Sequence, residues 1–211
     1  MQHCGAKLAV LGFIQTIFHV LLPQRSMFPD ADPSESLKGC VILADPSLRE
    51  PTFRHSVLLL TEHSADQGAL GYILNRPLGK TVGDLLFDPQ FEELTDIPVF
   101  IGGPVSTEHL TFSSLGWSES EDRLQFSTHL SAPQALRNLR EGFSVRAFVG
   151  YSGWAEGQLE SEMERNTWIT RDPEKRLLDT ESLDTLWNRL LRELSPWHAL
   201  IADEPDDLSL N

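Results

Sequence analysis

The pattern of apolar and polar positions near the middle of the chain predicts a β-hairpin over residues 53–78. Residues 57–60 are four consecutive apolar side chains, so a strand here must be covered on both faces. A second apolar run over residues 69–74 contains Gly71, which indicates a bulge or a close backbone approach. Because a short polar break separates the two runs, a hairpin is the simplest interpretation.

The same reading predicts the remaining elements. Further strands are expected at residues 39–44, 99–101, 109–115, 124–130, 144–151 and 166–170. Helical segments are expected at 81–87, ended by Pro89, at 131–141, from 155 to about 165 after a turn at 152–154, and at 182–194, ended by Pro196. Strands dominate the first part and helices the last, which predicts an α+β fold in a single domain.

The two ends of the chain differ from the centre. Residues 8–22 are apolar and contain no acidic residue, but they fall short of the roughly 20 residues that a membrane-spanning helix needs. Three interpretations stay open: a weak export or anchor segment, an extra amphipathic helix, or residues upstream of a true start at Met27. We expect residues 1–36, an apolar leader and polar lead-in, to lie outside the fold, residues 37–202 to form the domain, and residues 203–211 to be a disordered acidic tail.

Charge and cysteine content narrow the function classes. The chain has 211 residues and a formal charge of -14. This charge argues against direct nucleic-acid binding and against attraction to anionic lipid. Cys4 and Cys40 provide neither a disulfide framework nor a metal quartet, and a reducing cytoplasm fits them best. The histidines fall in separate predicted elements without metal-ligand spacing, so we expect no metal site and no cofactor.

Short motifs, many of them containing glycine, proline or an aromatic residue, are spread along the chain from Lys38 to the final predicted helix. In the first half they are Leu43-Ala44, Pro46, Leu48, Pro51, Phe53, Ser56-Val57, Glu62-His63, Gly68-Ala69, Gly71, Asn75 and Pro77-Leu78. In the second half they are Gly102-Gly103-Pro104, Gly150-Tyr151-Ser152-Gly153-Trp154, Gly157-Gln158-Leu159-Glu160, Glu162, Asn166 and Trp168. Taken together, these motifs resemble the YqgE/AlgH family of bacterial proteins. Asp45 and Glu50 depart from the family pattern, which usually has an apolar residue and an aspartate there.

The resemblance implies a bifurcated, partly barrel-like β-sheet surrounded by helices. It also implies a label, transcriptional regulator, that members of the family carry. It brings no catalytic residues and no cofactor to this chain.

Two groups of polar residues are candidates for a ligand or partner site. The first is Glu62, His63, Asn75 and Arg76, expected to gather at one end of the hairpin, where Glu62 and His63 could form an acid/base pair and Arg76 could hold an anion. The alternative, which we favour, is that these side chains satisfy loop backbone groups.

The second group is Ser152, Trp154 and Gln158, at the expected strand–turn–helix. Free amides at a helix start can bind anions, but nearby acidic residues disfavour phosphate. Ser152 lies outside a nucleophile-elbow motif, so packing is the favoured role of this segment.

The sequence therefore favours a non-catalytic regulatory or interaction protein that acts through a protein partner or a small ligand. The alternative is a small-molecule binder or hydrolase-type enzyme with one cleft formed by Glu62, His63, Asn75, Arg76, Ser152 and Trp154.

Overall fold

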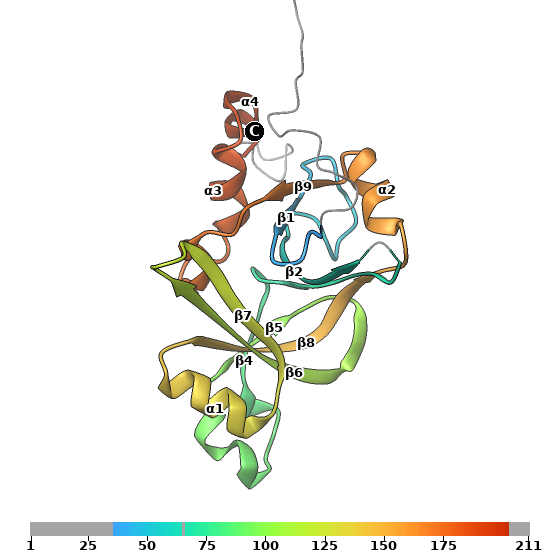
Figure 1. Cartoon of the computed structure of the whole chain (residues 1–211). Helices are drawn as coiled ribbons and strands as arrows, with labels where there is room; N and C mark the ends of the chain where they lie inside the picture. The colour runs from blue at the N-terminus through green and yellow to red at the C-terminus, as the bar shows by residue number, and fades with distance from the viewer. Residues whose placement is uncertain (1–35, 65, 203–211) are drawn as a thin grey trace, which may run out of the picture. The chain divides into compact units, whose positions relative to one another are not determined.

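Strand β8 (Ser144–Trp154) belongs to both halves of one curled sheet, and the other elements lie on either side of it (Figure 1). The computed structural model describes residues 36–64 and 66–202. Within these residues nine strands form the sheet, in the order β4-β5-β8-β3-β2-β1-β9, with β6 paired to β8 and β7 paired to β6.

The sheet divides along β8. Its first half is antiparallel and contains β1 (Val41–Ala44), β2 (Val57–Ser64), β3 (Gly68–Ile73), β9 (Trp168–Arg171) and residues 152–154 of β8. Its second half contains β4 (Pro77–Thr81), β5 (Pro98–Ile101), β6 (Val105–Ser118), β7 (Arg123–Leu130) and the earlier part of β8. Strands β5 and β8 are parallel to each other. This arrangement confirms the expected α+β fold with a bifurcated sheet.

Gly150 lies where β8 passes from one half of the sheet to the other. Its φ is +67°, and a Cβ at this position would lie 2.5 Å from the carbonyl oxygen of Gly103 and 2.8 Å from that of Val105. Both the backbone angle and the close approach require glycine. The division of the sheet therefore depends on this residue.

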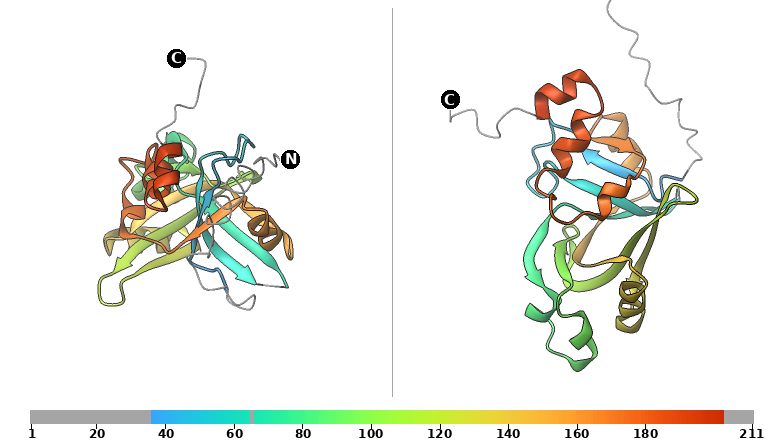
Figure 2. Two further views of the ribbon diagram at one scale, coloured as in Figure 1. Left: turned by 90° about the horizontal axis from the view of Figure 1, so that it is seen from above. Right: turned by 90° about the vertical axis from the view of Figure 1, so that its left-hand side faces the viewer.

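Helical segments cover both halves of the sheet. They are η1 (Val82–Asp84), η2 (Pro89–Leu94), α1 (Ala132–Arg140), α2 (Gln158–Glu164), η3 (Lys175–Leu178), α3 (Leu186–Arg192) and α4 (Pro196–Ala202). Figure 2 shows α3 and α4 near β1 and β9, and α1 at the opposite end beside β6 and β8. Among the described residues, no helix has both the length and the apolar character needed to cross a bilayer.

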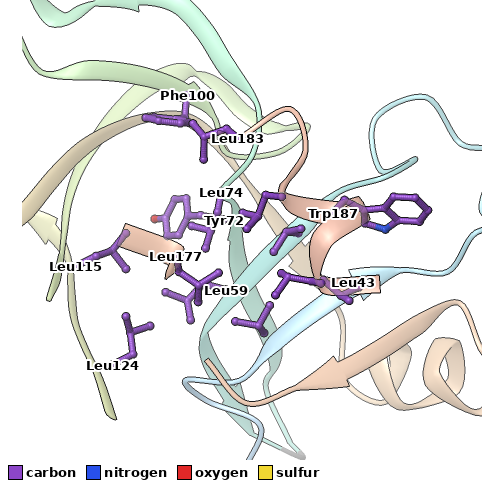
Figure 3. Packing of buried hydrophobic residues seen from close by; sticks show 14 of the residues in the cluster. Leu43, Leu59, Tyr72, Leu74, Phe100, Leu115, Leu124, Leu177, Leu183 and Trp187 are labelled. Atoms are coloured by element: carbon purple, nitrogen blue, oxygen red, sulfur yellow. The ribbon is translucent and has the colours of Figure 1, made fainter. Parts of the chain in front are cut away.

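Three clusters of buried apolar side chains hold these layers together. The first joins β1, β2, β3 and β6 to η3, α3 and α4, and Figure 3 shows its members gathered between the strands and the C-terminal segment. The second lies between the first half of the sheet and α2. The third lies between the second half of the sheet and η1, η2 and α1.

The apolar run in β2 is buried on both faces, as its pattern predicts. Val57 and Leu59 belong to the first cluster, whereas Leu58 and Leu60 belong to the second. Each fully buried leucine contributes about 1.5–3 kcal/mol to stability. Strand β2 thus anchors two layers at once.

Several predicted boundaries were wrong. The expected turn at 152–154 is strand, because Ser152 pairs with Gly71 and Trp154 with Ala69 on β3. Strand β4 was not predicted, and β6 begins at Val105 instead of residue 109. Edge and bulged strands carry a weak apolar alternation, which explains these omissions.

The helical segments at 82–84 and 186–192 end before Pro89 and Pro196, as expected, but each proline also begins a further helical segment that was not predicted. Pro89 is the first residue of η2, and Pro196 is the first residue of α4. Proline is tolerated at a first helical position because its missing N–H would have no intrahelical partner there. The expectations for residues 1–35 and 203–211 lie outside the described residues.

Candidate functional site

A pocket of about 440 Å³ opens between the end of β8, helix α2, the start of β9 and the loop that follows β1. We call it the indole pocket, after the two tryptophans in its wall. Its apolar lining consists of Leu48, Phe53, Pro104, Gly153, Trp154 and Trp168. Its polar lining consists of Glu50, Gln158, Glu162, Arg165 and Thr167.

The carboxylate of Glu162 organises the wall of this pocket. Its Oε2 accepts hydrogen bonds from the indole Nε1 of Trp154 at 2.9 Å and of Trp168 at 2.7 Å. Its Oε1 accepts from Nε2 of Gln158 at 2.9 Å. Both indoles are almost fully buried, so Glu162 satisfies two donors that would otherwise be orphaned.

The local sequence places these groups on one side. Gln158 and Glu162 are four residues apart on α2 and therefore share a helix face. The helix ends at Glu164, and Asn166, whose φ is +55°, reverses the chain and brings Trp168 back onto β9 beside Glu162. Asparagine is among the residues that tolerate this left-handed conformation.

Aromatic packing forms the rest of the wall. The ring of Trp168 lies edge-on to Phe53, with centroids 5.5 Å apart, and edge-on to Trp154, with centroids 5.9 Å apart. Phe53 is held in place because the carboxylate of Glu50 accepts hydrogen bonds from the backbone N–H groups of Thr52 and Phe53. The loop after β1 thus supplies one wall of a site otherwise built by β8, α2 and β9.

Only two of the seven candidate residues line the indole pocket: Trp154 and Gln158. Ser152 is fully buried and donates its hydroxyl to the carbonyl oxygen of Gly102 at 3.1 Å. It therefore fastens β8 to the residue after β5 and is not presented to the pocket.

The expected gathering of Glu62, His63, Asn75 and Arg76 does not occur. In the antiparallel hairpin, Glu62 and His63 pair with Leu70 and Ala69 near the turn, whereas Asn75 follows β3 and lies beside Val57, at the start of β2. Five residues of strand separate these positions, which is about 16 Å. The prediction overlooked that the residues leaving the second strand meet the beginning of the first.

Asn75 and Arg76 hold loop backbone. The side chain of Asn75 accepts from Val57 N and donates to His55 O, both at 2.9 Å. Nη2 of Arg76 donates to Arg54 O at 2.6 Å. Burial lowers the pKa of the Arg76 guanidinium, and the charge of Glu50 opposes this shift.

Glu62 and His63 point to opposite faces of β2, because successive side chains of a strand alternate. The two ring nitrogens of His63 are both used: Nδ1 accepts from Leu37 N at 3.0 Å, and Nε2 lies 2.7 Å from Glu160 Oε1. The proton is therefore on Nε2, and the ring ties the chain before β1 to α2. Glu62 lines a separate open groove of about 720 Å³ beside β7.

Reasoning from sequence missed the centre of the site. Glu162 and Trp168 were recognised as motif residues but not as site residues, although the i, i+4 spacing of Gln158 and Glu162 was a usable signal. Phe53 and Glu50 had no such signal, since about 100 residues separate them from α2. Within the described ranges, no group of three or more His, Cys, Asp or Glu residues has an arrangement that could hold a metal ion.

The sequence of this chain is similar to a family of known proteins. A family model described as AlgH-like matches residues 41–199. A UPF0301 protein of Mycobacteroides abscessus is 36% identical over 195 residues, which cover 86% of this chain and 91% of the relative. A UPF0301 protein of Streptomyces coelicolor is 35% identical over 190 residues, covering 83% of this chain and 96% of the relative.

Two solved structures share the fold. A Corynebacterium diphtheriae protein aligns with a TM-score of 0.64 and 21% identity, over 84% of this chain and 95% of that protein. The solution structure of AlgH from Pseudomonas aeruginosa aligns with a TM-score of 0.55 and 25% identity, over 85% of this chain and all of AlgH. The matched region contains the whole indole pocket, and the chain belongs to the AlgH-like family.

Proposed function

We propose that this chain is a non-catalytic binding protein of the cytoplasm with a regulatory or interaction role. The indole pocket is the place where it takes a small ligand or a side chain of a partner protein. The observation that carries this proposal is that Trp154, Gln158 and Trp168 all donate hydrogen bonds to the carboxylate of Glu162 in the wall of an open pocket.

The candidate catalytic side chains, Ser152 and His63, make structural contacts, which favours a binding role over catalysis. Ser152 is buried against a carbonyl group, and both nitrogens of His63 are occupied by structural contacts. A single catalytic cleft would need Glu62 and His63 on one face together with Arg76, and the hairpin separates them. The hydrolase alternative therefore loses its proposed geometry.

The strong negative charge of the chain argues against a regulatory role through direct DNA binding. A chain with a formal charge of -14 is repelled by the phosphate backbone of DNA. A role in transcription would then be exerted through a ligand or a protein partner, and not through direct contact with DNA.

A fragment screen by NMR tests the proposal. The indole N–H groups of Trp154 and Trp168 give resonances that report directly on the pocket, and Trp197, 66% exposed and outside the pocket, serves as the internal reference. We expect several fragments to shift the two pocket resonances saturably while Trp197 is unchanged.

The matched variants are Thr167→Phe, which enlarges a pocket-lining side chain, and Gln67→Phe, which changes an exposed residue of the β2–β3 turn. Binding should be lost in the first and kept in the second. The proposal is wrong if no fragment acts on the pocket resonances, or if the protein turns over a substrate in a hydrolase panel and Ser152→Ala abolishes that turnover.

A further inference from the structure

Among residues 36–64 and 66–202, the carboxylate of Glu162 has no ionic partner. All three hydrogen bonds to its carboxylate come from neutral donors, two indole N–H groups and one carboxamide. Within the part of the chain that the structure describes, no ion pair involves this residue. Neutral donors stabilise a carboxylate without cancelling its charge, so a negative potential remains at the pocket wall.

Two other charged side chains line the pocket, Arg165 and Glu50. Arg165 is exposed at the rim, and its Nε donates to the backbone oxygen of Ser161 on its own helix. Glu50 adds a second carboxylate; burial lowers the pKa of Arg76, and Glu50 is near enough to that guanidinium to oppose the shift. Within the described residues, Glu162 forms no ion pair with Arg165 or with any other cation, so its charge is not paired at contact distance.

Aromatic rings occupy the wall beside this carboxylate. Phe53, Trp154 and Trp168 all line the pocket, and Trp168 contacts both other rings edge-on. Aromatic faces attract ammonium and guanidinium groups through their quadrupole, and tryptophan does so best. An aromatic wall with a carboxylate in it suits a cation that carries apolar carbon.

We infer that the indole pocket selects organic cations, in which an ammonium or guanidinium nitrogen meets Glu162 and the attached carbon packs on the aromatic wall. This inference rests on the proposed function, because it names the ligand class of the same pocket. Two sources share this chemistry: a free amine and a lysine or arginine side chain of a partner protein.

Paired probes separate charge from shape. For the free amine the pair is choline and its uncharged carbon analogue 3,3-dimethylbutan-1-ol. For the side chain the pair is the blocked tripeptide acetyl-Gly-Lys-Gly-amide and the same peptide with norleucine in place of lysine. Each is titrated into the full chain while the indole resonances of Trp154 and Trp168 are followed, with Trp197 as the reference for non-specific attraction to an acidic protein.

We expect the charged member of at least one pair to shift the two pocket resonances saturably, and its neutral partner to bind at least about tenfold more weakly. Glu162→Gln keeps an acceptor for the indoles and removes the charge, so it should weaken cation binding by about tenfold, the size of one charge-assisted hydrogen bond. Glu164→Gln, on the exposed side of α2, should leave binding unchanged.

Neutral probes that bind as well as the cations, or unchanged cation binding in Glu162→Gln, would overturn the cation inference. In both cases the pocket still binds and the proposed function stands. If neither cation pair acts but other fragments shift the pocket resonances, the cation inference fails and the proposed function again survives. If no probe and no fragment shifts the indole resonances of Trp154 and Trp168, both the cation inference and the proposed function are wrong.

Discussion

At the residue scale, single polar side chains of the family motifs join separate segments of the chain by hydrogen bonds. Asn75 bridges the first residue of β2 to the loop before it, His63 bridges the chain before β1 to α2, and Glu162 joins two tryptophans. A buried donor left without a partner costs about 1–3 kcal/mol. Removing any of these side chains should therefore lower the measured free energy of unfolding.

Glu162→Ala leaves two nearly buried indole N–H groups without an acceptor. We expect it to lower the free energy of unfolding by about 2–4 kcal/mol, measured by urea denaturation. Glu162→Gln should lose much less, since its amide oxygen can still accept. The control Glu164→Ala should change stability by no more than about 0.5 kcal/mol. Equal losses in both alanine variants would contradict this role of Glu162.

Arg146 is a different case, because it is buried without a full set of partners. Within the described part of the chain, its Nη2 donates to Leu177 O, while Nε and Nη1 have no hydrogen-bond partner, and the guanidinium lies over the ring of Phe100. Burial lowers the pKa of Arg146 to about 10, against the opposing charge of Asp179. We expect Arg146→Met to be within about 1 kcal/mol of wild type, or more stable, because an apolar side chain removes the cost of burying the charge.

The matched comparison is Arg171→Met. Arg171 donates to Leu190 O, Glu174 and Glu193, so its loss removes a complete network and should destabilise the fold in thermal unfolding. A large loss in Arg146→Met would instead indicate that the charge has a stabilising partner.

At the scale of elements, an ionic network fastens η3 and α3 to the end of β9. Glu193, after the last residue of α3, pairs with Arg171 of β9 and Arg176 of η3. Helices of this length are not stable alone, so such contacts and the first apolar cluster hold them in place.

The network predicts a pH dependence. Desolvation raises the pKa of Glu193, but hydrogen bonds and charge from Arg176 and then Arg171 outweigh it, so the pKa lies below its ordinary value of 4.5. A depressed carboxyl pKa stabilises the fold above the unfolded value, and this contribution is lost as pH falls through the folded value. Glu193→Gln should therefore be less stable than wild type at pH 7, and the difference should shrink below pH 4.5.

Urea unfolding at neutral and acidic pH measures this difference. The exposed Glu141→Gln serves as the control and should show no such convergence. A gap between wild type and Glu193→Gln that stays constant with pH would contradict the assignment.

At the scale of the whole molecule, the fold depends on the change of partners along β8. Residues 147–149 pair with β5 and β6, whereas residues 152–154 pair with β3. The chain crosses between the two halves at residues 150–151, where Tyr151 still pairs with Val105 of β6, so the two halves share this one strand.

Gly150→Ala should destabilise the protein by about 3 kcal/mol or more, because it adds left-handed strain of about 1–2 kcal/mol and a clash with backbone. The matched variant is Gly79→Ala, where φ is +70° but no atom of the described residues lies within 4 Å of the added Cβ. It should cost only the strain. Thermal unfolding of the two variants separates these terms, and equal losses would show that the crossing tolerates a side chain.

The pattern of the sequence correctly predicted what depends on neighbouring residues. The buried strand at residues 57–60, the helix around Ser131 and the α+β fold class follow from local periodicity and capping. The separation of Asn75 from Glu62 could not be read in the same way, because it depends on which ends of two antiparallel strands meet.

The sequence by itself determined the apolar faces, the charge and the motifs, since these are properties of residues near one another along the chain. Only the tertiary structure decided that Glu162 would face two indoles from different strands, and that a loop about 100 residues earlier would bring Phe53 against them. The physical reason is that a pocket is made by long-range strand pairing and packing, and the register and curvature of the sheet set which distant side chains meet.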